Sequence, residues 1–434
     1  MRANAFSADA IGIDFGTTNS SIALASASGE VRMVPFSFAG ALSPSFRSVL
    51  YFEMMRPSRR THSLTGPAAI ERYLEADEKG RLVQSLKSHL ASHLFDGTVF
   101  YSRRYSIEEM VAAMLKDLRL AAEAHFKRPI RSATVGRPVR FESSETDEDD
   151  AYAESRLRKA FTMAGFEKVD FEFEPVAAAC AYEATLDRDE LILIGDFGGG
   201  TSDFSLLRVG PTVLRRGRTP EDLLGNGGVG LAGDAFDARI VRKLVSPELG
   251  SDSEVISFHK RLPAVPAWIY ANLERWHYLS FLRTRNVREM LKGVLVRALE
   301  PNKIEALIAL IEEDLGYPLY QAVQEVKYEL SRSESAEFRF NEGSLDLRAR
   351  VTRAEFESWI EPDLQRLEKA VDTLLENCGV APAKVDRVFL TGGTSFVPAV
   401  RRIFTSRFGE ERIRTGNAFT SVAHGLALRA LQRA

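Results

Sequence analysis

Two segments of the chain, far apart in sequence, repeat one unusual pattern. The segment IGIDFGTTNSSIALA begins at Ile11, and the segment LILIGDFGGGTSDFSLL begins at Leu191. In each, an apolar run ends in Asp-Phe-Gly, small hydroxyl-bearing residues follow, and a second apolar run resumes. This pattern predicts a strand, a tight turn and a return strand. Two matched copies indicate a duplicated structural unit, with one copy in each half of the chain.

The residues between these repeats alternate between strand-like and helix-like patterns. Ser106 and Glu109 form a capping box at the start of a predicted helix, and an acidic run predicts a second helix that ends near Gly165. A third helix is expected from Glu174, and an amphipathic one around Lys87. The glycine-rich stretch 225–233 is expected to be a loop. This alternation favours an α/β fold.

Length and composition exclude several classes of protein. A chain of 434 residues is too long for one hydrophobic core, so two or more lobes are expected. A net charge of −3 indicates no general affinity for nucleic acid or anionic membranes. No apolar run has the length of a membrane span, and the N-terminus lacks the apolar core of a signal peptide. We therefore expect a cytoplasmic protein with no nucleic-acid and no membrane partner.

The repeated turns carry chemistry that suits nucleotide phosphates. Glycines let backbone N–H groups approach a phosphate, and threonine hydroxyls can donate to it or bind metal-held water. An aspartate would repel phosphate directly, so we expect it to act through a bound Mg²⁺ and its water molecules. A third segment, VFLTGGTSFVPAV, predicts a strand that enters a Gly-Gly turn before a helix. Such a turn can accept the adenosine end of the nucleotide.

These three segments, in this order and spacing, resemble the phosphate-1, phosphate-2 and adenosine motifs of the actin, sugar-kinase and heat-shock ATPase superfamily. In detail they resemble the nucleotide-binding domain of the 70-kilodalton heat-shock chaperone family. The resemblance runs from about Ile11 to the C-terminus. It implies an α/β, two-lobed actin-like ATPase fold, in which duplicated ribonuclease-H-like domains enclose a central nucleotide cleft.

The resemblance also implies where the lobes begin and end. Lobe I would take residues 1–190, with a small subdomain at about 37–105, and the C-terminal helix 417–434 would complete it. Lobe II would take residues 191–416, with a helical subdomain at about 231–350. No substrate-binding domain is expected after it, because the chain looks most like the short bacterial members of YegD type, which lack the peptide-binding domain.

The residues that match the family's motifs are the expected site residues. Four would act in catalysis, and two aspartates would hold the metal through water: Lys87, Glu174, Asp196 and Thr201 for catalysis, and Asp14 and Asp196 for Mg²⁺. In the family, the lysine offsets charge on the transferring phosphoryl group, and the glutamate helps position the attacking water. The remaining residues would contact ATP or ADP: Asp14, Gly16, Thr17, Thr18, Asn19, Gly198, Gly199, Gly200, Asp203, Gly233, Gln324, Lys327, Tyr328, Ser331, Gly392, Gly393 and Thr394.

Some positions depart from the family's pattern. Tyr328 stands where the family usually presents an arginine against the adenine, and Phe396 likewise replaces an arginine beside the Gly-Gly turn. Val176 replaces the threonine that follows Glu-Pro, and Ala232 replaces a glycine. Pro138 matches the proline of the family's interlobe switch. These changes concern base binding and nucleotide exchange more than phosphate binding.

The resemblance implies a slow, Mg²⁺-dependent ATPase that acts as a molecular switch with a chaperone-like role. Its partners would be protein clients or co-chaperones, and the chain is expected to be a monomer. Two alternatives on the same fold stay open: a small-molecule kinase, which needs a carboxylate base beside an acceptor pocket, and a nucleotide-dependent filament. A scaffold that binds ATP without turnover is a third.

Overall fold

The computed structural model describes residues 9–38, 40–55, 60–76, 80–142, 144–257, 259–275, 279–415 and 421–433. Internal contacts divide the chain into two compact units. The first unit comprises Met1–Gly230, Glu368–Ser395 and Arg402–Ala434, and the second comprises Leu231–Leu367 and Phe396–Arg401. In the part of the chain that is described, no helix has both the length and the apolar character needed to cross a membrane.

The first unit contains a sheet built around the first repeated segment. Its strands lie in the order β13-β12-β1-β2-β3, and β6 (Phe46–Arg47) also pairs with β2. The bounds are Ala10–Phe15 for β1, Asn19–Ala25 for β2, Val31–Met33 for β3, Ser132–Arg137 for β12 and Lys168–Phe173 for β13. From β1, the pairing is antiparallel toward β2 and β3, and parallel toward β12 and β13.

A second sheet, built around the second repeated segment, has the same plan. Its order is β16-β15-β14-β21-β22, with antiparallel pairing from β14 toward β15 and β16 and parallel pairing toward β21 and β22. The bounds are Glu190–Phe197 for β14, Ser202–Val209 for β15, Leu223–Val229 for β16, Arg387–Thr391 for β21 and Ile413–Thr415 for β22. The predicted duplication and the α/β fold class are therefore confirmed.

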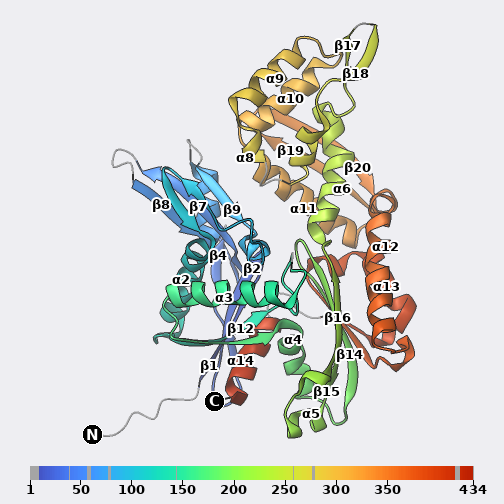
Figure 1. Cartoon of the computed structure of the whole chain (residues 1–434). Helices are drawn as coiled ribbons and strands as arrows, with labels where there is room; N and C mark the ends of the chain where they lie inside the picture. The colour runs from blue at the N-terminus through green and yellow to red at the C-terminus, as the bar shows by residue number, and fades with distance from the viewer. Residues whose placement is uncertain are drawn as a thin grey trace. The chain divides into compact units, whose positions relative to one another are not determined.

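Helices of the first unit lie beside these sheets, and α2, α3 and α4 lie where the sequence predicted helices (Figure 1). Both predicted helix starts have complete capping boxes, at Ser106 with Glu109 and at Thr146 with Asp149, which satisfy backbone N–H groups that no helical bond uses. The helices are α2 (Ile107–Phe126), α3 (Asp147–Met163), α4 (Glu174–Glu183), α5 (Pro211–Arg216), most of α13 (Pro398–Phe408) and α14 (Ser421–Arg433). Of the predicted C-terminal helix, residues 417–420 and 434 lie outside the described residues.

Short strands and one helix complete the N-terminal part of this unit. They are β4 (Phe36–Phe38), β5 (Ala41–Ser43), β7 (Val49–Met55), β8 (Arg60–Thr65), α1 (Gly66–Glu75), β9 (Arg81–Gln84), β10 (Gly97–Phe100) and β11 (Arg103–Ser106). The expected amphipathic helix around Lys87 is wrong. That segment is strand β9 followed by a single 3₁₀ turn, η1 (Leu86–His89), because β9 pairs with the central strand β7.

The second unit is mainly helical, with two β-hairpins. Its helices are α6 (Gly233–Ile240), α7 (Ala267–Leu273), α8 (Leu279–Leu282), α9 (Arg285–Leu295), α10 (Pro301–Glu312), α11 (Gly316–Arg332) and most of α12 (Arg353–Asn377). The hairpins are β17 (Glu254–Ser257) with β18 (Lys260–Pro263), and β19 (Ser335–Glu342) with β20 (Leu345–Thr352). The loop predicted for residues 225–233 is partly wrong, since residues up to 229 form strand β16 beside β15.

Close backbone contacts hold α14 against the first sheet. A Cβ added to Gly425 would lie 1.7 Å from the carbonyl oxygen of Ala177 in α4, and one added to Gly12 would lie 2.2 Å from the backbone nitrogen of Ala427. Figure 1 shows α14 beside β1 and α4, in agreement with this packing. Only glycine permits such an approach at these positions.

Substituting Gly425 tests this packing. We expect Gly425→Ala to destabilise the protein by about 3 kcal/mol, because the added methyl group must displace backbone atoms of α4. The matched control is Gly293→Ala on the exposed side of α9, where no heavy atom lies within 4 Å of the added Cβ. It should be neutral or stabilise by up to about 1 kcal/mol through helix propensity. Urea unfolding of both variants measures the difference, and equal stabilities would contradict the packing argument.

Candidate functional site

The two repeated turns occupy equivalent places in the two sheets. Asp14 is the penultimate residue of β1 and Asp196 the penultimate residue of β14. After each strand the chain turns through glycines and threonines, and the return strands begin at Asn19 and Ser202. The first turn is tight enough that a Cβ on Gly16 would lie 2.2 Å from the carbonyl oxygen of Asn19. Both aspartates are half-buried residues.

Lys87 and Glu174 form an ion pair. The distance from Lys87 Nζ to Glu174 Oε1 is 2.6 Å, and the two side chains are only 9% and 13% exposed. Glu174 is the first residue of α4, where Pro175 fixes the backbone, and Lys87 lies on η1. A lysine ammonium is strongly hydrated, so its burial is favourable only beside negative charge. The fold therefore brings together two residues that are far apart in sequence.

The buried charges perturb one another. Burial and the nearby Glu174 and Asp196 carboxylates raise the pKa of Asp14 to about 8, although Lys87 opposes this shift. Burial also raises the pKa of Asp196, against the effect of its hydrogen bond from Thr391. Burial alone would lower the pKa of Lys87, but Glu174, Asp14 and Asp196 together raise it. The group is thus one electrostatic cluster in which carboxylates outnumber the ammonium.

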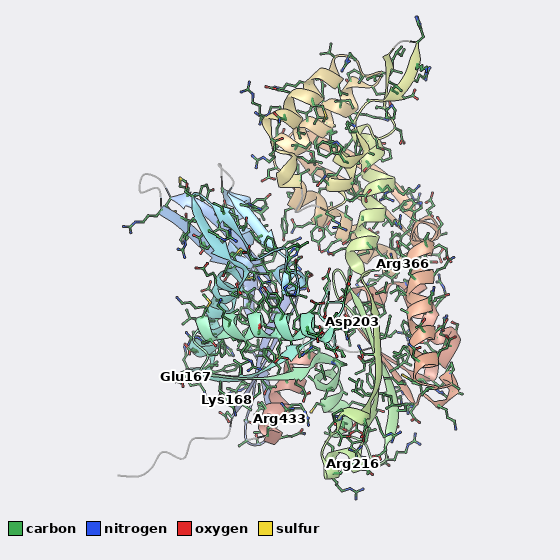
Figure 2. The ribbon with its side chains drawn as sticks, in the orientation of Figure 1. Glu167, Lys168, Asp203, Arg216, Arg366 and Arg433 are labelled. Atoms are coloured by element: carbon green, nitrogen blue, oxygen red, sulfur yellow. The ribbon has the colours of Figure 1, made fainter. Side chains whose placement is uncertain are left out.

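Asp203, labelled in Figure 2, lies directly opposite Asp196 on the return strand β15. Burial and Asp196 raise its pKa to about 7, although the Thr201 hydroxyl, whose oxygen lies 3.0 Å from its Oδ2, lowers it. The turn itself is closed by a hydrogen bond from the backbone N–H of Gly198 to the carbonyl oxygen of Thr201, at 2.9 Å. Residues 198–201 thus form one compact turn beside the two acids.

The third predicted segment joins the second turn directly. The Thr391 hydroxyl donates to Asp196 Oδ1 at 2.5 Å, and the two residues are register partners in the parallel pair β14 and β21. Gly392 has φ of +86°, and a Cβ there would lie 1.9 Å from the carbonyl oxygen of Phe197. Gly393 is exposed, whereas Thr394 is only 3% exposed. The Gly-Gly turn therefore packs against the end of β14.

The other adenosine-side residues lie in the second unit, on α6 and α11. The Lys327 ammonium is 2.6 Å from Asp237 Oδ1 and also donates to the carbonyl oxygen of Gly233 at 3.3 Å. Tyr328 is 58% exposed, and the guanidinium of Arg332 lies 4.7 Å from its ring centroid. Arg332 therefore lies one helical turn after Tyr328, the position at which the family usually has an arginine.

The two remaining contact residues of α11 have local partners. Gln324 Nε2 donates to the Tyr320 hydroxyl at 2.5 Å, and the Ser331 hydroxyl donates to the carbonyl oxygen of Tyr328 at 2.6 Å. Both bonds join residues one turn apart on the same helix. The nucleotide contacts expected of these side chains stay a prediction.

The structure adds residues that the sequence interpretation missed. Thr391 is one of them, and its position directly before the predicted Gly392-Gly393 turn could have identified it from the sequence. Glu142 is another: its two carboxylate oxygens lie 3.8 Å from where a Cβ on Gly200 would be, so this acid faces the second turn. It follows Pro138 in a loop after β12, and no spacing rule indicated it. Glu142 also opposes the effect of burial, which lowers the pKa of His89.

Neither a cluster of direct metal ligands nor the cavity beside the Pro138 loop marks the site in the described residues. Within the described ranges, no three His, Cys, Asp or Glu side chains converge closely enough to hold a metal ion directly. A cavity of about 770 Å³ lies in the first unit beside the Pro138 loop, between charged residues of α3 and Asn226 of β16. None of the expected site residues lines it. We therefore identify the site by its converging buried charges and not by cavity volume.

Comparisons with known proteins show the family to which the chain belongs. A family model described as "Hsp70 protein" matches residues 70–256 and 312–431. The chain is 27% identical over 424 residues to the chaperone protein DnaK of Thermosipho melanesiensis, and this alignment covers 97% of the chain and 58% of the relative. Similar values hold for DnaK of Thermosipho africanus, at 26%, and of Thermotoga petrophila, at 27%. The chain spans about three-fifths of the length of these relatives.

The raised pKa of Asp14 predicts how the stability of the protein changes with pH. Its pKa of about 8 exceeds the ordinary 3.8, so its contribution to stability falls as pH rises between these values. We expect Asp14→Asn to stabilise the protein, free of nucleotide and treated with EDTA, by about 1–3 kcal/mol at pH 8 and by less at pH 5. Thermal unfolding at both pH values measures this.

A matched control is Asp170→Asn, because Asp170 is exposed and, among the described residues, forms an ion pair with Lys168 at 3.4 Å. This change should leave the unfolding temperature almost unaltered at both pH values. An Asp14→Asn protein that is less stable than the wild type at pH 8 would contradict the electrostatic interpretation.

Proposed function

Because the chain belongs to the Hsp70 family, we propose that it is an ATP- and Mg²⁺-dependent molecular switch that hydrolyses ATP slowly to ADP and phosphate. One observation carries the proposal. The buried Lys87–Glu174 ion pair lies in one electrostatic cluster with Asp14 and Asp196, at the ends of two equivalent strands. A positioned ammonium beside a cluster of carboxylates suits phosphoryl transfer, which depends on positioning and charge compensation.

The charge balance of the site suits a divalent cation. Four carboxylates, those of Asp14, Glu174, Asp196 and Asp203, face the single ammonium of Lys87. Mg²⁺ takes oxygen ligands and usually keeps several water molecules, so half-buried carboxylates can hold it through those waters. When bound, Mg²⁺ would neutralise charge on the phosphates. Asp14 and Asp196 would accept hydrogen bonds from its water shell.

The two turns would hold the phosphates. Backbone N–H groups at Gly16–Asn19 and at Gly199 and Gly200 would donate to them, and the hydroxyls of Thr17 and Thr18 would add donors. The N–H of Gly198 instead closes the second turn, and the Thr201 hydroxyl would reach phosphate only by leaving Asp203. The Thr391 hydroxyl fixes the orientation of Asp196 through its 2.5 Å bond. Each turn would thus contribute donors to phosphate and one carboxylate to the metal's water shell.

Lys87 and Glu174 would act on the reacting groups. We propose that Lys87 Nζ compensates the charge that develops on the transferring phosphoryl group. Glu174, whose Oε1 is held by Lys87, would use its other carboxylate oxygen to orient the attacking water. Water is then the acceptor, and no covalent intermediate with the protein forms.

Adenosine would contact the Gly392-Gly393 turn and residues of α11. Tyr328 is exposed and can stack on a base, and Arg332 beside its ring supplies a nearby cation. Gly233, Gln324, Lys327, Ser331 and Thr394 are further proposed contacts. ATP affinity of Tyr328→Ala and Arg332→Ala variants would measure their contributions.

We also propose a chaperone-like role with protein clients or co-chaperones as partners. It rests on family membership and on the relatives' name, chaperone protein DnaK. The switch would then alter affinity for a protein partner between its ATP and ADP states. Affinity capture with the protein in each nucleotide state tests this, and partners retained equally in both states would contradict it.

The hydrolysis proposal predicts the effect of substituting Lys87. We expect Lys87→Ala to lower the single-turnover rate of ATP hydrolysis by about 10²–10³-fold, because a charge-compensating donor is lost. ATP binding should persist, since the turns supply most phosphate donors. Glu174→Ala and Asp14→Asn should also lower the rate, the latter together with Mg²⁺ dependence. ADP formation from bound ATP, separated chromatographically, is the measurement.

The control is Lys168→Ala, which removes an exposed lysine at the start of β13 (Figure 2). It should leave the rate unchanged. Unchanged rates in all three site variants would refute the assignments. Strong stimulation of ATP consumption by a sugar or carboxylate acceptor would instead indicate a kinase, and nucleotide-dependent sedimentation would indicate a filament.

A further inference from the structure

Lys87 lies on an element that has little stability of its own. The turn η1 contains four residues, and the residue before it, Ser85, has a left-handed φ of 58°. Short 3₁₀ turns have poor hydrogen-bond geometry, and a left-handed conformation is unfavourable for serine. The residues that follow, up to Phe95, belong to no helix or strand. We call residues Leu86–Phe95 the Lys87 segment. Contacts from other parts of the chain must fix its position.

Two kinds of contact supply this fixation: the buried apolar side chains of Leu86, Leu90 and Ala91, and a buried arginine of α3. Arg156 is 3% exposed, and its guanidinium donates to three main-chain carbonyls of the Lys87 segment. Nη1 lies 3.2 Å from the oxygen of Leu90, 3.1 Å from that of Ser92 and 3.3 Å from that of Phe95, and Nη2 lies 3.2 Å from the last. These contacts begin three residues after Lys87. No regular backbone pairing competes for the carbonyls.

The charge of Arg156 is balanced on its other side. Its Nε lies 3.4 Å from Oε1 of Glu108, at the start of α2. Although burial opposes it, hydrogen bonds at the helix start and the charges of Arg156 and Lys159 lower the pKa of Glu108, so this partner stays ionised. A planar guanidinium with five donors can bridge one carboxylate and several carbonyls at once, which a lysine cannot do.

A second contact from α3 supports the same segment. The ring of His93 stacks on Tyr152 with centroids 4.3 Å apart, and Arg156 lies over the same tyrosine at 5.1 Å. His93 Nε2 is also 3.2 Å from Asp149 Oδ1. Tyr152 therefore contacts both the arginine and the segment that the arginine holds. The N-terminal half of α3 acts as the support for the Lys87 segment.

We propose that Arg156 is a positioning residue: by holding the carbonyls of Leu90, Ser92 and Phe95, it keeps Lys87 Nζ against Glu174. The effect of Arg156 on the rate of hydrolysis rests on the proposed function. Its effect on the position of the Lys87 side chain does not. Arg156 touches neither the turns nor Glu174 among the contacts described, so it acts only through the segment.

Amine labelling tests the placement without any nucleotide. In the nucleotide-free full chain, Lys87 should react slowly with an N-hydroxysuccinimide acetate reagent, because it is buried and paired. In Arg156→Met, we expect acetylation of Lys87, measured by mass spectrometry, to rise by about tenfold or more as the segment opens locally. Lys327, buried beside Asp237 in the second unit, serves as the internal reference and should not change.

The matched control is Arg119→Met. Arg119 also donates to a main-chain carbonyl, that of Ala164 at 2.9 Å, and pairs with Glu123, but it holds the far end of α3. It should lower stability without exposing Lys87. Equal labelling of Lys87 in the two variants, or no rise in Arg156→Met, would overturn the proposal. If Arg156→Met does not fold, Arg156→Lys decides: labelling above wild type supports the proposal, and wild-type labelling overturns it.

Kinetics give a second, separate readout. If the proposed hydrolysis is correct, Arg156→Met should lower the single-turnover rate by about 10²-fold, the usual cost of small misplacement, with ATP affinity unchanged within about twofold. Arg119→Met should keep the wild-type rate. A loss of affinity with an unchanged rate would contradict positioning of Lys87. Raised labelling in a protein whose wild type hydrolyses no ATP would support the placement while refuting the proposed function.

Discussion

The Lys87–Glu174 ion pair is the interaction on which the arrangement of the site depends. A lysine removed from water is costly by several kcal/mol unless a negative partner compensates it, and removing one member leaves an uncompensated buried charge. Glu174 supplies this compensation from the first turn of α4, where helix geometry fixes it. Asp14 and Asp196 lie in the same field: Glu174 raises the pKa of each aspartate, and Lys87 lowers it.

Duplication explains why two aspartates reach one cluster. Each sheet places the penultimate residue of its central strand next to a turn, so the same local rule positions Asp14 and Asp196. The copies have since diverged: the second contains Asp203 opposite its aspartate and is braced by Thr391 from the neighbouring strand. In the first copy, the residue opposite Asp14 is Ser21, so this copy has no second acid at that position. Equivalent backbones thus carry different charges, as a site that holds an asymmetric ligand requires.

The sequence predicted what local patterns determine. The paired strands at both repeats follow from alternating apolar residues, and the starts of α2 and α3 follow from capping residues that act within four positions. The structure of the Lys87 segment was not predictable in this way. Its 3₁₀ turn follows from the pairing of β9 with β7 and from Arg156, both distant in sequence. Lys87 itself was identified only by resemblance, because its burial depends on tertiary contacts.

The residues of the charged cluster are held by supports of different kinds. Asp14 and Asp196 lie on central strands with partners on both sides, so their positions are fixed by the sheets. Lys87 lies on a single turn whose place depends on side-chain contacts from α3. Elements with few backbone bonds open at low free energy, whereas central strands open only with the whole domain. The position of Lys87 therefore depends on tertiary side-chain contacts, whereas the positions of the two aspartates depend on backbone pairing.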